Sequence, residues 1–385
     1  MTSFPDKVPL ILFLFSDTGG GHRSAAEAVV EALRLEYGDR VSTKMVDVFK
    51  DFAPSPLNHL PDLYPKIVRL PRAWSLGYHL SDGRKRAGVI SIGAWPYVRS
   101  SIRRLFDSNP SDLIVSVHPL MNGTVLRALG NQHPDFVTIV TDLVTTHSFW
   151  YCRDVDLCLV PTDEARNKAL RLGLKSKQLR VTGLPVADRF CKPIAEKKAL
   201  RERYGWPAER PLILLTGGGE GMGPLEEVAY VLSKNCPTAS LVVITGRNQN
   251  LRTKLERQDW AIPTFIYGFV HEMPDFMRAA DILVTKAGPG TISEAFIAGL
   301  PMVLYSRLPG QEDGNVSYVV SQGAGVWAPR KEAIAAAVKE WLEMPDKHAE
   351  AVAACKRLAR PQAARQIAHI LIEQLTISEK MHMEL

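Results

Sequence analysis

Paired cysteines and long hydrophobic runs are both missing from this sequence, and each absence narrows the class of protein. The 385 residues include five cysteines, none of which forms a Cys-x-x-Cys pair. The odd count and the spacing argue against a zinc module and a secreted disulfide scaffold, so we expect a reducing compartment. The apolar run at residues 8–15 is far shorter than the roughly 20 residues that span a bilayer. It predicts a buried first strand rather than a signal peptide.

Charge bias is also modest. The chain has 47 Lys and Arg against 41 Asp and Glu, a net charge of +6, and 46% hydrophobic residues. This composition excludes a disordered chain, a collagen-like repeat and a coiled coil. The length suits two domains of about 150–200 residues, each with its own core.

Short apolar runs alternate with helical patterns along most of the chain, which is typical of parallel α/β sheets. The predicted strands are 10–15, 43–48, 113–117, 136–140 and 157–160 in the first half, and 212–215, 240–245, 264–267, 282–285 and 302–305 in the second. The proline-rich stretch 184–210 reads as a linker and an entry helix. We therefore predict two Rossmann-like domains, 1–190 and 196–359, that face each other across a cleft and bind ligands at the carboxyl ends of their strands.

A glycine turn at Gly288-Pro289-Gly290 joins a predicted strand to a helix that we expect to open at Thr291. The uncapped N–H groups and the dipole of such a helix attract an anion, and a diphosphate fits there. Glu294, one turn further on, is placed to reach ribose hydroxyls. The alternative is a plain tight turn followed by a favourable acidic residue.

Two further loops follow strands of the second domain. The first loop, residues 217–223, is not a Walker A loop. Its glycines favour a loop wrapped around a ligand. In the second loop, residues 309–315, amide and carboxylate groups suit the hydroxyls of a sugar. The alternative is an ordinary solvated loop. Three such loops predict a nucleotide-sugar pocket. The donor-binding candidates in these two loops are Gly217, Gly218, Gly219 and Gly221, and Gln311, Glu312 and Asn315.

Several motifs resemble those of the monogalactosyldiacylglycerol synthase family, to whose glycosyltransferase group the bacterial diacylglycerol glucosyltransferases also belong. They are Lys286-Ala-Gly-Pro-Gly-Thr-Ile-x-Glu294, Gly310-Gln-Glu-x-Gly-Asn315, Asp17-Thr-Gly-Gly-Gly-His22, Ser116-Val-His-Pro119 and Thr182-Gly-Leu-Pro185. The resemblance implies a GT-B fold, a UDP-hexose donor with galactose favoured over glucose, a diacylglycerol acceptor and inversion at the anomeric carbon. It also implies that the last helix, 360–385, packs back on the first domain.

The loop at 17–22 has two interpretations. Read as a dinucleotide fingerprint it is weak, because the third glycine is missing and His22 stands where a pyrophosphate would need bare backbone. Read as part of a transferase, Gly20 and Gly21 border the acceptor and His22 takes the proton of the attacking hydroxyl, for which an imidazole suits neutral pH. Asp142 is the rival: it is the base itself, it orients a histidine, or it is only a structural turn acid.

Three more residues are candidates for the acceptor side. His118 and His147 are expected to line the cleft, and Trp150 to pack against an acyl chain or glycerol. Each has a simpler reading, as a satisfied interior histidine or a core aromatic residue. No cofactor or metal is expected, because backbone N–H groups at the donor loops would stabilise the leaving UDP electrostatically. Asp154-Val-Asp156 matches a metal-binding pattern of other transferases, but we interpret it as the start of a strand.

The stretch 66–104 carries nine cations and a single acid, Asp82, interleaved with aromatic and aliphatic residues. Such a segment suits docking onto an anionic membrane surface, where each cation contributes about 1 kcal/mol. Nucleic-acid binding is the competing reading of a basic patch, but the chain has no recognised nucleic-acid motif. A charged solvated helix face is the plain alternative. The candidate membrane residues are Arg69, Arg72, Trp74, Arg84, Lys85, Arg86 and Trp95.

Together these features predict an inverting transferase that moves a hexose from UDP-hexose to 1,2-diacylglycerol as a peripheral enzyme at the cytoplasmic face of a membrane. Two alternatives share the fold. One is a peptidoglycan-precursor N-acetylglucosamine transferase, and the other is a catalytically silent scaffold that senses lipid or nucleotide.

Overall fold

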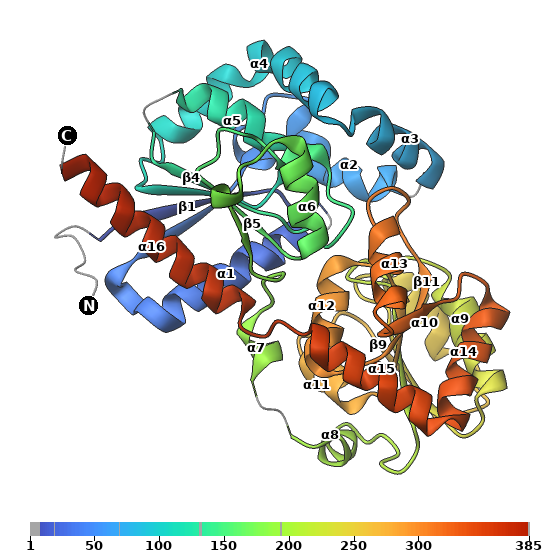
Figure 1. Cartoon of the computed structure of the whole chain (residues 1–385). Coiled ribbons are helices and arrows are strands. Elements are labelled where there is room, and N and C mark those ends of the chain that lie inside the picture. The colour runs from blue at the N-terminus through green and yellow to red at the C-terminus, as the bar shows by residue number, and fades with distance from the viewer. Residues whose placement is uncertain (1–7, 19, 69, 131–132, 193–194, 384–385) are drawn as a thin grey trace. The chain divides into compact units, whose positions relative to one another are not determined.

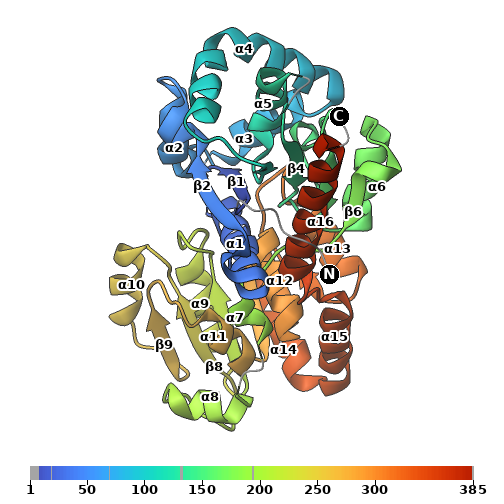
Figure 2. The same ribbon diagram turned by 90° about the vertical axis from the view of Figure 1, so that its left-hand side faces the viewer.

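A computed structural model describes residues 8–18, 20–68, 70–130, 133–192 and 195–383, and the chain forms two compact units. Unit 1 comprises residues 1–188, 309–311 and 362–385, and unit 2 comprises 189–308 and 312–361. Each unit is a parallel sheet of six strands with helices on both faces (Figures 1 and 2). Within the described part of the chain, no helix is both long and apolar enough to cross a bilayer.

The sheet of unit 1 has the strand order β2-β1-β3-β4-β5-β6. Its strands are β1 (Leu10–Phe15), β2 (Ser42–Asp47), β3 (Leu113–Ser116), β4 (Asp135–Ile139), β5 (Leu157–Val160) and β6 (Leu179–Val181). Its α-helices are α1 (Gly21–Tyr37), α2 (Leu60–Ile67), α3 (Pro71–Ser81), α4 (Arg84–Asp107), α5 (Asn122–Leu129), α6 (Asp163–Leu172) and α16 (Ala363–Met383), and α7 (Asp188–Cys191) begins at its boundary. Short turns of other helix types are η1 (Gly38–Arg40), η2 (Val48–Phe52), η3 (Leu57–His59), η4 (Pro119–Met121), η5 (Ser148–Trp150) and η6 (Ser176–Gln178).

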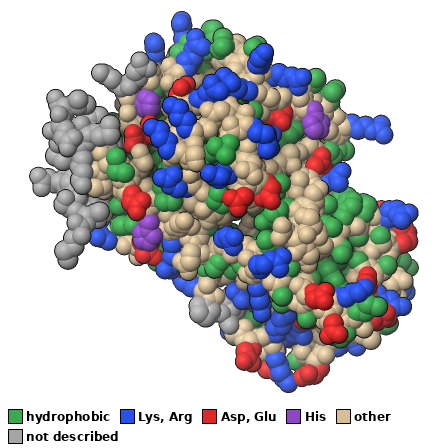
Figure 3. Space-filling model, in the orientation of Figure 1, with side chains coloured by type: hydrophobic (Ala, Val, Ile, Leu, Met, Phe, Trp, Pro, Cys, Tyr) green, Lys and Arg blue, Asp and Glu red, His purple; other side chains and the backbone are tan. Residues whose placement is uncertain are grey.

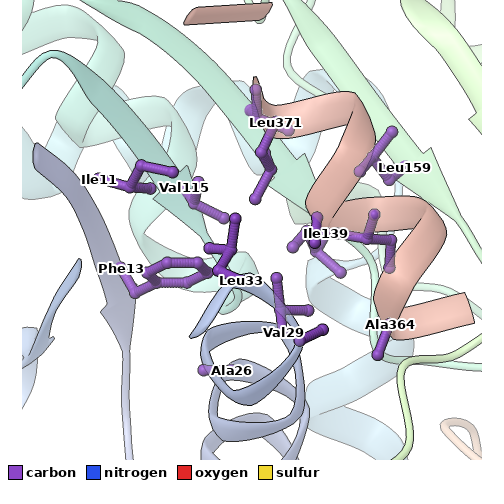
Figure 4. Close-up of a cluster of buried hydrophobic side chains, with 14 of the residues drawn as sticks. Ile11, Phe13, Ala26, Val29, Leu33, Val115, Ile139, Leu159, Ala364 and Leu371 are labelled. Carbon is purple, nitrogen blue, oxygen red and sulfur yellow. The ribbon is translucent and has the colours of Figure 1, made fainter. Parts of the chain in front are cut away.

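One face of this sheet is covered by α1 and α16, although these helices lie at opposite ends of the sequence. Val29 and Leu33 of α1 and Leu371 of α16 belong to one buried cluster with Phe13 and Ile139 of the strands (Figure 4). Helical spacing of small and aliphatic residues gives α1 this buried stripe. The C-terminal helix is therefore part of the core of unit 1.

The other face packs against α4, α5 and the turns around η2 and η5. Leu105 of α4, Val125 of α5 and Trp150 of η5 lie in its core and are fully buried. Because helices cover both faces, the inner strands are apolar at nearly every position rather than alternating, as β3 illustrates.

Unit 2 has the strand order β12-β11-β10-β7-β8-β9. Its strands are β7 (Leu212–Thr216), β8 (Ser240–Ile244), β9 (Thr264–Tyr267), β10 (Ile282–Lys286), β11 (Met302–Ser306) and β12 (Gly325–Trp327). Its helices are α8 (Lys197–Arg203), α9 (Leu225–Asn235), α10 (Gln249–Glu256), α11 (Met273–Ala279), α12 (Pro289–Ala298), α13 (Asp313–Ser321), α14 (Lys331–Glu343) and α15 (Pro345–Leu358).

Each sheet has one point where the strand order reverses: between β1 and β3 in unit 1, and between β7 and β10 in unit 2. Open parallel sheets bind ligands just outside the carboxyl ends of the strands at such a point. In unit 1 the loops there lead to His22 and His118. In unit 2 they are the glycine loop 217–223 and the turn that opens α12.

The predicted strands all appear, with ends that differ by one residue at most, but two helix starts were placed too late. α1 begins at Gly21 rather than near Ser24, so His22 lies in its first turn and not in a loop. α12 begins at Pro289 rather than at Thr291, because proline is favoured in the first turn of a helix.

Candidate functional site

The switch point of unit 1 gathers two histidines. The rings of His22 and His118 lie 4.6 Å apart, and His118 also meets Phe49 of η2 at 5.5 Å. Thr141 Oγ1, after β4, shares a hydrogen bond of 2.7 Å with His22 Nδ1. Thr18 Oγ1 is 3.0 Å from His118 Nε2, while the buried His118 Nδ1 has no hydrogen-bond partner among the described residues.

Asp142 lies beside this pair, at the same edge of the sheet. Its Oδ2 accepts a hydrogen bond of 2.7 Å from the Trp150 indole N–H. Its Oδ1 accepts one of 3.0 Å from Gln311 Nε2, in the three-residue segment 309–311 that groups with unit 1. The Trp150 ring is in turn 5.9 Å from that of His22. In the sequence, Thr141-Asp142 followed by His147 and Trp150 also resembles the family, but Thr141 itself was given no role.

Burial shifts the titration of all three groups toward the uncharged form. It lowers the pKa of His22 to about 4, against a smaller raising effect of the Val117 backbone. It also lowers the pKa of His118, and the neighbouring His22 adds to that effect. Burial raises the pKa of Asp142, although its hydrogen bonds with Gln311 and Trp150 oppose the shift. At neutral pH His22 is therefore an uncharged imidazole that can accept a proton.

Two acceptor-side candidates have structural roles here. Trp150 is fully buried, so it supports Asp142 from within the core instead of facing an acyl chain. His147 is 6% exposed; its Nδ1 accepts from the Phe149 N–H at 3.2 Å and its Nε2 lies 3.1 Å from Ser81 Oγ. It thereby caps η5 at its start.

Gly20 and Gly21 leave the approach to this cluster open. Gly20 precedes α1 with a φ of 79°, which favours glycine. A Cβ atom added at either glycine would have no atom within 4 Å. Gly19, between the two halves of the predicted motif, lies outside the described residues.

In unit 2 the first turn of α12 is open in the same way. A Cβ at Gly290 would also have no atom within 4 Å, and no side chain caps the helix. Thr291 and Glu294 follow on this helix, both partly exposed. Burial raises the pKa of Glu294 to about 7, and Arg189 acts in the opposite direction.

Lys286, the last residue of β10, is a component that sequence reasoning quoted but did not assign. Its Nζ lies 2.7 Å from Glu312 Oε1, and its side chain passes the positions where Gly218 and Gly288 lack a Cβ. A cation beside a helix N-terminus is unfavourable unless an anion joins them. Glu312 is 4% exposed and its Oε2 accepts from the Leu308 N–H at 2.7 Å, so both its oxygens are occupied. The carboxylate thus holds Lys286 in place rather than facing a sugar.

In the loop 217–223, glycine is required mainly because neighbouring backbone leaves no space for side chains. The predicted role was a loop wrapped around a ligand. A Cβ at Gly217 would lie 2.2 Å from the Met222 carbonyl oxygen, and one at Gly221 would lie 2.1 Å from that of Thr245. Gly218 and Gly219 have more room, with nearest neighbours at 3.4 and 3.7 Å. Of the four glycines predicted to bind the donor in this loop, only Gly218 and Gly219 therefore leave space beside the chain.

Asn315 is 1% exposed and ties α13 to the β10–α12 turn. Its Nδ2 donates to the Ala287 carbonyl at 3.0 Å, and its Oδ1 has no partner in the described part of the chain. Asn315 therefore stabilises the turn between β10 and α12.

Phe269, which sequence reasoning missed, follows β9 at the same edge of the sheet. Its ring is 49% exposed and the Arg247 guanidinium lies 4.9 Å from its centroid. An exposed aromatic ring backed by an arginine can stack a base. A phenylalanine two residues past a predicted strand end was the available signal.

The predicted membrane segment forms α2, α3 and α4, whose outer surface mixes cations with aliphatic side chains (Figure 3). Trp74 is partly buried against Tyr64, with ring centroids 5.5 Å apart, and Trp95 packs on the core with Arg127 above it. The tryptophans therefore face inward more than we expected, and Arg69 lies outside the described residues. Exposed cations are Lys66, Arg72, Arg84, Lys85, Arg86, Arg99, Arg103 and Arg104. Exposed apolar residues are Leu63, Ile67, Leu70, Leu76, Leu80, Val89, Ile90, Ile92 and Tyr97.

Unit 1 also contains an open cleft of about 840 Å³ beneath α4. Arg84, Ile92, Arg127, Ser148 and Phe149 are among the residues that line it. Asp154 lines it too, whereas Asp156 Oδ2 accepts from the Phe136 N–H at 2.7 Å and so secures the start of β5.

Comparison with known proteins agrees with this architecture. The Glycosyltransferase family 28 C-terminal domain profile matches residues 212–367. The crystal structure of the glycotransferase of kitacinnamycin is similar with a TM-score of 0.63 at 14% identity, over 96% of this chain and 99% of that one. At that identity the likeness concerns the fold. The chain is a two-domain glycosyltransferase of GT-B fold, as predicted.

The N-terminal unit specifies the group more closely. The Monogalactosyldiacylglycerol (MGDG) synthase profile matches residues 22–186. The probable monogalactosyldiacylglycerol synthase 2 of Oryza sativa subsp. indica is 42% identical over 86% of this chain and 73% of its own length. Monogalactosyldiacylglycerol synthase 1 of Arabidopsis thaliana is 38% identical over 96% and 71%, respectively. The chain belongs to the monogalactosyldiacylglycerol synthase family, which confirms the resemblance seen in its motifs.

Proposed function

We propose that this protein transfers galactose from UDP-galactose to 1,2-diacylglycerol with inversion at the anomeric carbon, while bound peripherally to an anionic membrane surface. The observation that carries the donor half of this proposal is Lys286 beside the open N-terminus of α12. The names of the relatives support the acceptor and the sugar.

On the donor side, two positive features converge at the switch point of unit 2. Helix geometry directs the N–H groups of Gly290 and Thr291 out of the first turn of α12. Lys286 Nζ lies 3.1 Å from the position that a Cβ would take at Gly288, the residue just before that turn. Both attract the diphosphate and stabilise the charge that grows on it as UDP departs. Glu294 accepts hydrogen bonds from the ribose hydroxyls, and Phe269 stacks on the uracil ring.

On the acceptor side, the reaction needs a group that takes one proton. The hydroxyl oxygen of diacylglycerol forms a bond to the anomeric carbon as the bond from that carbon to the diphosphate breaks, and UDP leaves with the electron pair. The hydroxyl proton passes to His22, which is neutral at physiological pH. Asp142 is the alternative acceptor of that proton.

The segment α2–α4 supports action at a membrane. It exposes eight cations of residues 66–104 together with several large aliphatic side chains. An acceptor with two acyl chains resides in a bilayer, so the enzyme must meet it there. The interspersed charges attract anionic headgroups, and the aliphatic residues enter the interface.

The decisive experiment offers two acceptors separately, diacylglycerol vesicles and a lipid-linked peptidoglycan precursor, each with UDP-galactose, UDP-glucose or UDP-N-acetylglucosamine in parallel and in the presence of EDTA. We expect β-monogalactosyldiacylglycerol from UDP-galactose alone. Product from UDP-glucose would reassign the sugar, and transfer only to a peptidoglycan precursor would reassign the acceptor. UDP binding without transfer to either acceptor would indicate a silent scaffold.

A further inference from the structure

Asp82 is the only acid in the basic segment 66–104, and it does not belong to the charged surface of that segment. It sits in the short connection between α3 and α4, with 26% of its side chain exposed. Both neighbours along the chain and Asp82 itself bond to the loop that contains η5. This connection joins the two helices that carry most of the exposed aliphatic side chains of the segment 66–104.

The carboxylate of Asp82 is held from two sides. Its Oδ1 accepts hydrogen bonds from the Ser148 N–H at 2.8 Å and from Ser148 Oγ at 2.5 Å. Its Oδ2 is 3.1 Å from Lys168 Nζ of α6. Hydrogen bonds in which one partner is ionised are about twice as strong as neutral ones, so this is a firm attachment.

The attachment extends to the residues on either side of Asp82. The Gly83 N–H donates to Ser148 Oγ at 3.0 Å, and Ser81 Oγ lies 3.1 Å from His147 Nε2. Ser81 at the end of α3 and the two connecting residues Asp82 and Gly83 thus bond to His147, which caps η5, and to Ser148, its first residue. A shift of these helices must move η5 or break these bonds.

η5 in turn supports the reaction side of unit 1. Its last residue, Trp150, donates its indole N–H to Asp142 at 2.7 Å, and the Trp150 ring is 5.9 Å from that of His22. Only Phe149 separates Ser148 from Trp150 in the chain. The path from the exposed helices to the candidate base therefore passes through two residues of one short turn.

We propose that Asp82 is a positioning residue that couples contact between α3–α4 and an apolar surface to the placement of the Asp142–Trp150 pair beside His22. The proposal rests on the proposed transferase function. Coupling of this kind needs two arrangements of one packed element whose balance the surface shifts. In Asp82→Asn the new side chain can still accept hydrogen bonds from Ser148. Its amide N–H groups, however, face the ammonium of Lys168, so the attachment to Lys168 is weakened.

The test compares Asp82→Asn with the wild type on two forms of acceptor: diacylglycerol in anionic vesicles, and dioctanoylglycerol below its aggregation concentration. We expect turnover on vesicles to fall about tenfold to a hundredfold, as a small misplacement of a catalytic group produces. Turnover on the dispersed acceptor should fall much less. KM for UDP-galactose, cosedimentation with vesicles and the melting temperature should stay close to wild type.

Two further variants sharpen the comparison. Asp62→Asn makes the same charge change at an exposed residue of α2 and should leave both activities unchanged. Lys168→Met removes one partner of Asp82 and should give a smaller loss in the same direction. An equal fall on both acceptors, with the ratio between them unchanged, would mean that Asp82 only stabilises the fold and would overturn the proposal.

A readout without turnover separates this proposal from the proposed function. The histidine NMR signal of His22 should shift when lipid bicelles are added to the wild type, and not in Asp82→Asn. If no acceptor is glycosylated but this difference appears, the transferase assignment fails and the coupling stands. If His22 does not respond to bicelles in the wild type, the coupling is wrong whatever the activity.

Discussion

His22 and Glu294 both have pKa values displaced by burial, and in both the uncharged form gains. For His22 the lowered pKa keeps the imidazole neutral down to about pH 4. A neutral ring is ready to accept a proton over the whole physiological range. The same shift makes its conjugate acid unstable, so a proton that His22 accepts in the proposed reaction is readily released again.

Replacing His22 by alanine should lower turnover about a hundredfold to ten-thousandfold, the usual contribution of a general base. The affinity for UDP-galactose, measured by calorimetry, should change little because the donor contacts lie in unit 2. The exposed His59→Ala is the matched control. A histidine NMR titration of the wild type should place the His22 midpoint near pH 4. A variant with near wild-type turnover would transfer the role of base to Asp142.

Glu294 should make donor binding depend on pH. Its pKa is raised to about 7 in the free protein, so the carboxylate that accepts from ribose hydroxyls is present above that pH and is lost below it. We expect the affinity for UDP-galactose, whose diphosphate diester does not titrate in this range, to weaken as pH falls from 8 to 6. Glu294→Gln should bind about tenfold or more weakly at pH 8, with no pH dependence. A wild-type affinity constant across this range would exclude Glu294 from the ribose site.

Residue types were easier to predict than residue roles. The glycine and histidine motifs identified both switch points, because the backbone conformations and reactive groups needed there leave a mark in the sequence. The ion pair of Lys286 with Glu312 and the bond of Thr141 to His22 join residues from different elements of the chain, and the bond of Trp150 to Asp142 spans an irregular loop. No local pattern contains such a pairing.

At the level of elements, two glycines that look alike in sequence have opposite environments. Gly221 has a φ of +59° and no space for a Cβ, whereas Gly290 lies in a helix beside open space. Gly221→Ala should lower the free energy of unfolding by at least about 2 kcal/mol, since both the backbone strain and the clash with Thr245 oppose it. Gly290→Ala should raise it by about 0.5–1 kcal/mol, the usual gain in a helix.

Gly290→Ala also tests the donor site. Gly290→Ala should weaken UDP binding despite its greater stability, because the new methyl group stands where the diphosphate approaches the helix. Urea unfolding and calorimetric titration with UDP check the two halves of the prediction. Unchanged UDP affinity in Gly290→Ala would place the diphosphate elsewhere.

The strands that sequence analysis missed were the two shortest. β6 and β12 have three residues each, and Arg180 in the middle of β6 is exposed. Both lie at sheet edges, where one side of the strand is free of a neighbour and the apolar demand is weaker. An edge strand of this length leaves no run of buried residues to detect.

For the whole molecule, two similar α/β units share one chain, and their switch points carry different chemistry. Unit 1 presents two neutral histidines beside Asp142, and unit 2 presents Lys286, which is paired with Glu312, beside the open first turn of α12. The chain starts in unit 1, builds unit 2 and returns through α16, whose Leu371 lies in the first core beside α1 (Figure 4). The family resemblance implied that the last helix packs back on the first domain, whereas the residues of that helix by themselves do not say which core it joins.

The proposed membrane contact is a property of the surface of unit 1 rather than of any single side chain, and we expect that mutations can remove it without removing catalysis. Leu76 and Leu80, each 62% exposed, lie one turn apart on α3. Changing both to glutamate places two charges where we propose that the helix enters the lipid interface, so cosedimentation with anionic vesicles should fall about tenfold or more. Leu35→Glu, on α1 and 48% exposed, changes charge outside this segment and should bind vesicles normally. UDP affinity should remain unchanged in both variants; equal loss of vesicle binding in both would mean that net charge, not α3, determines docking.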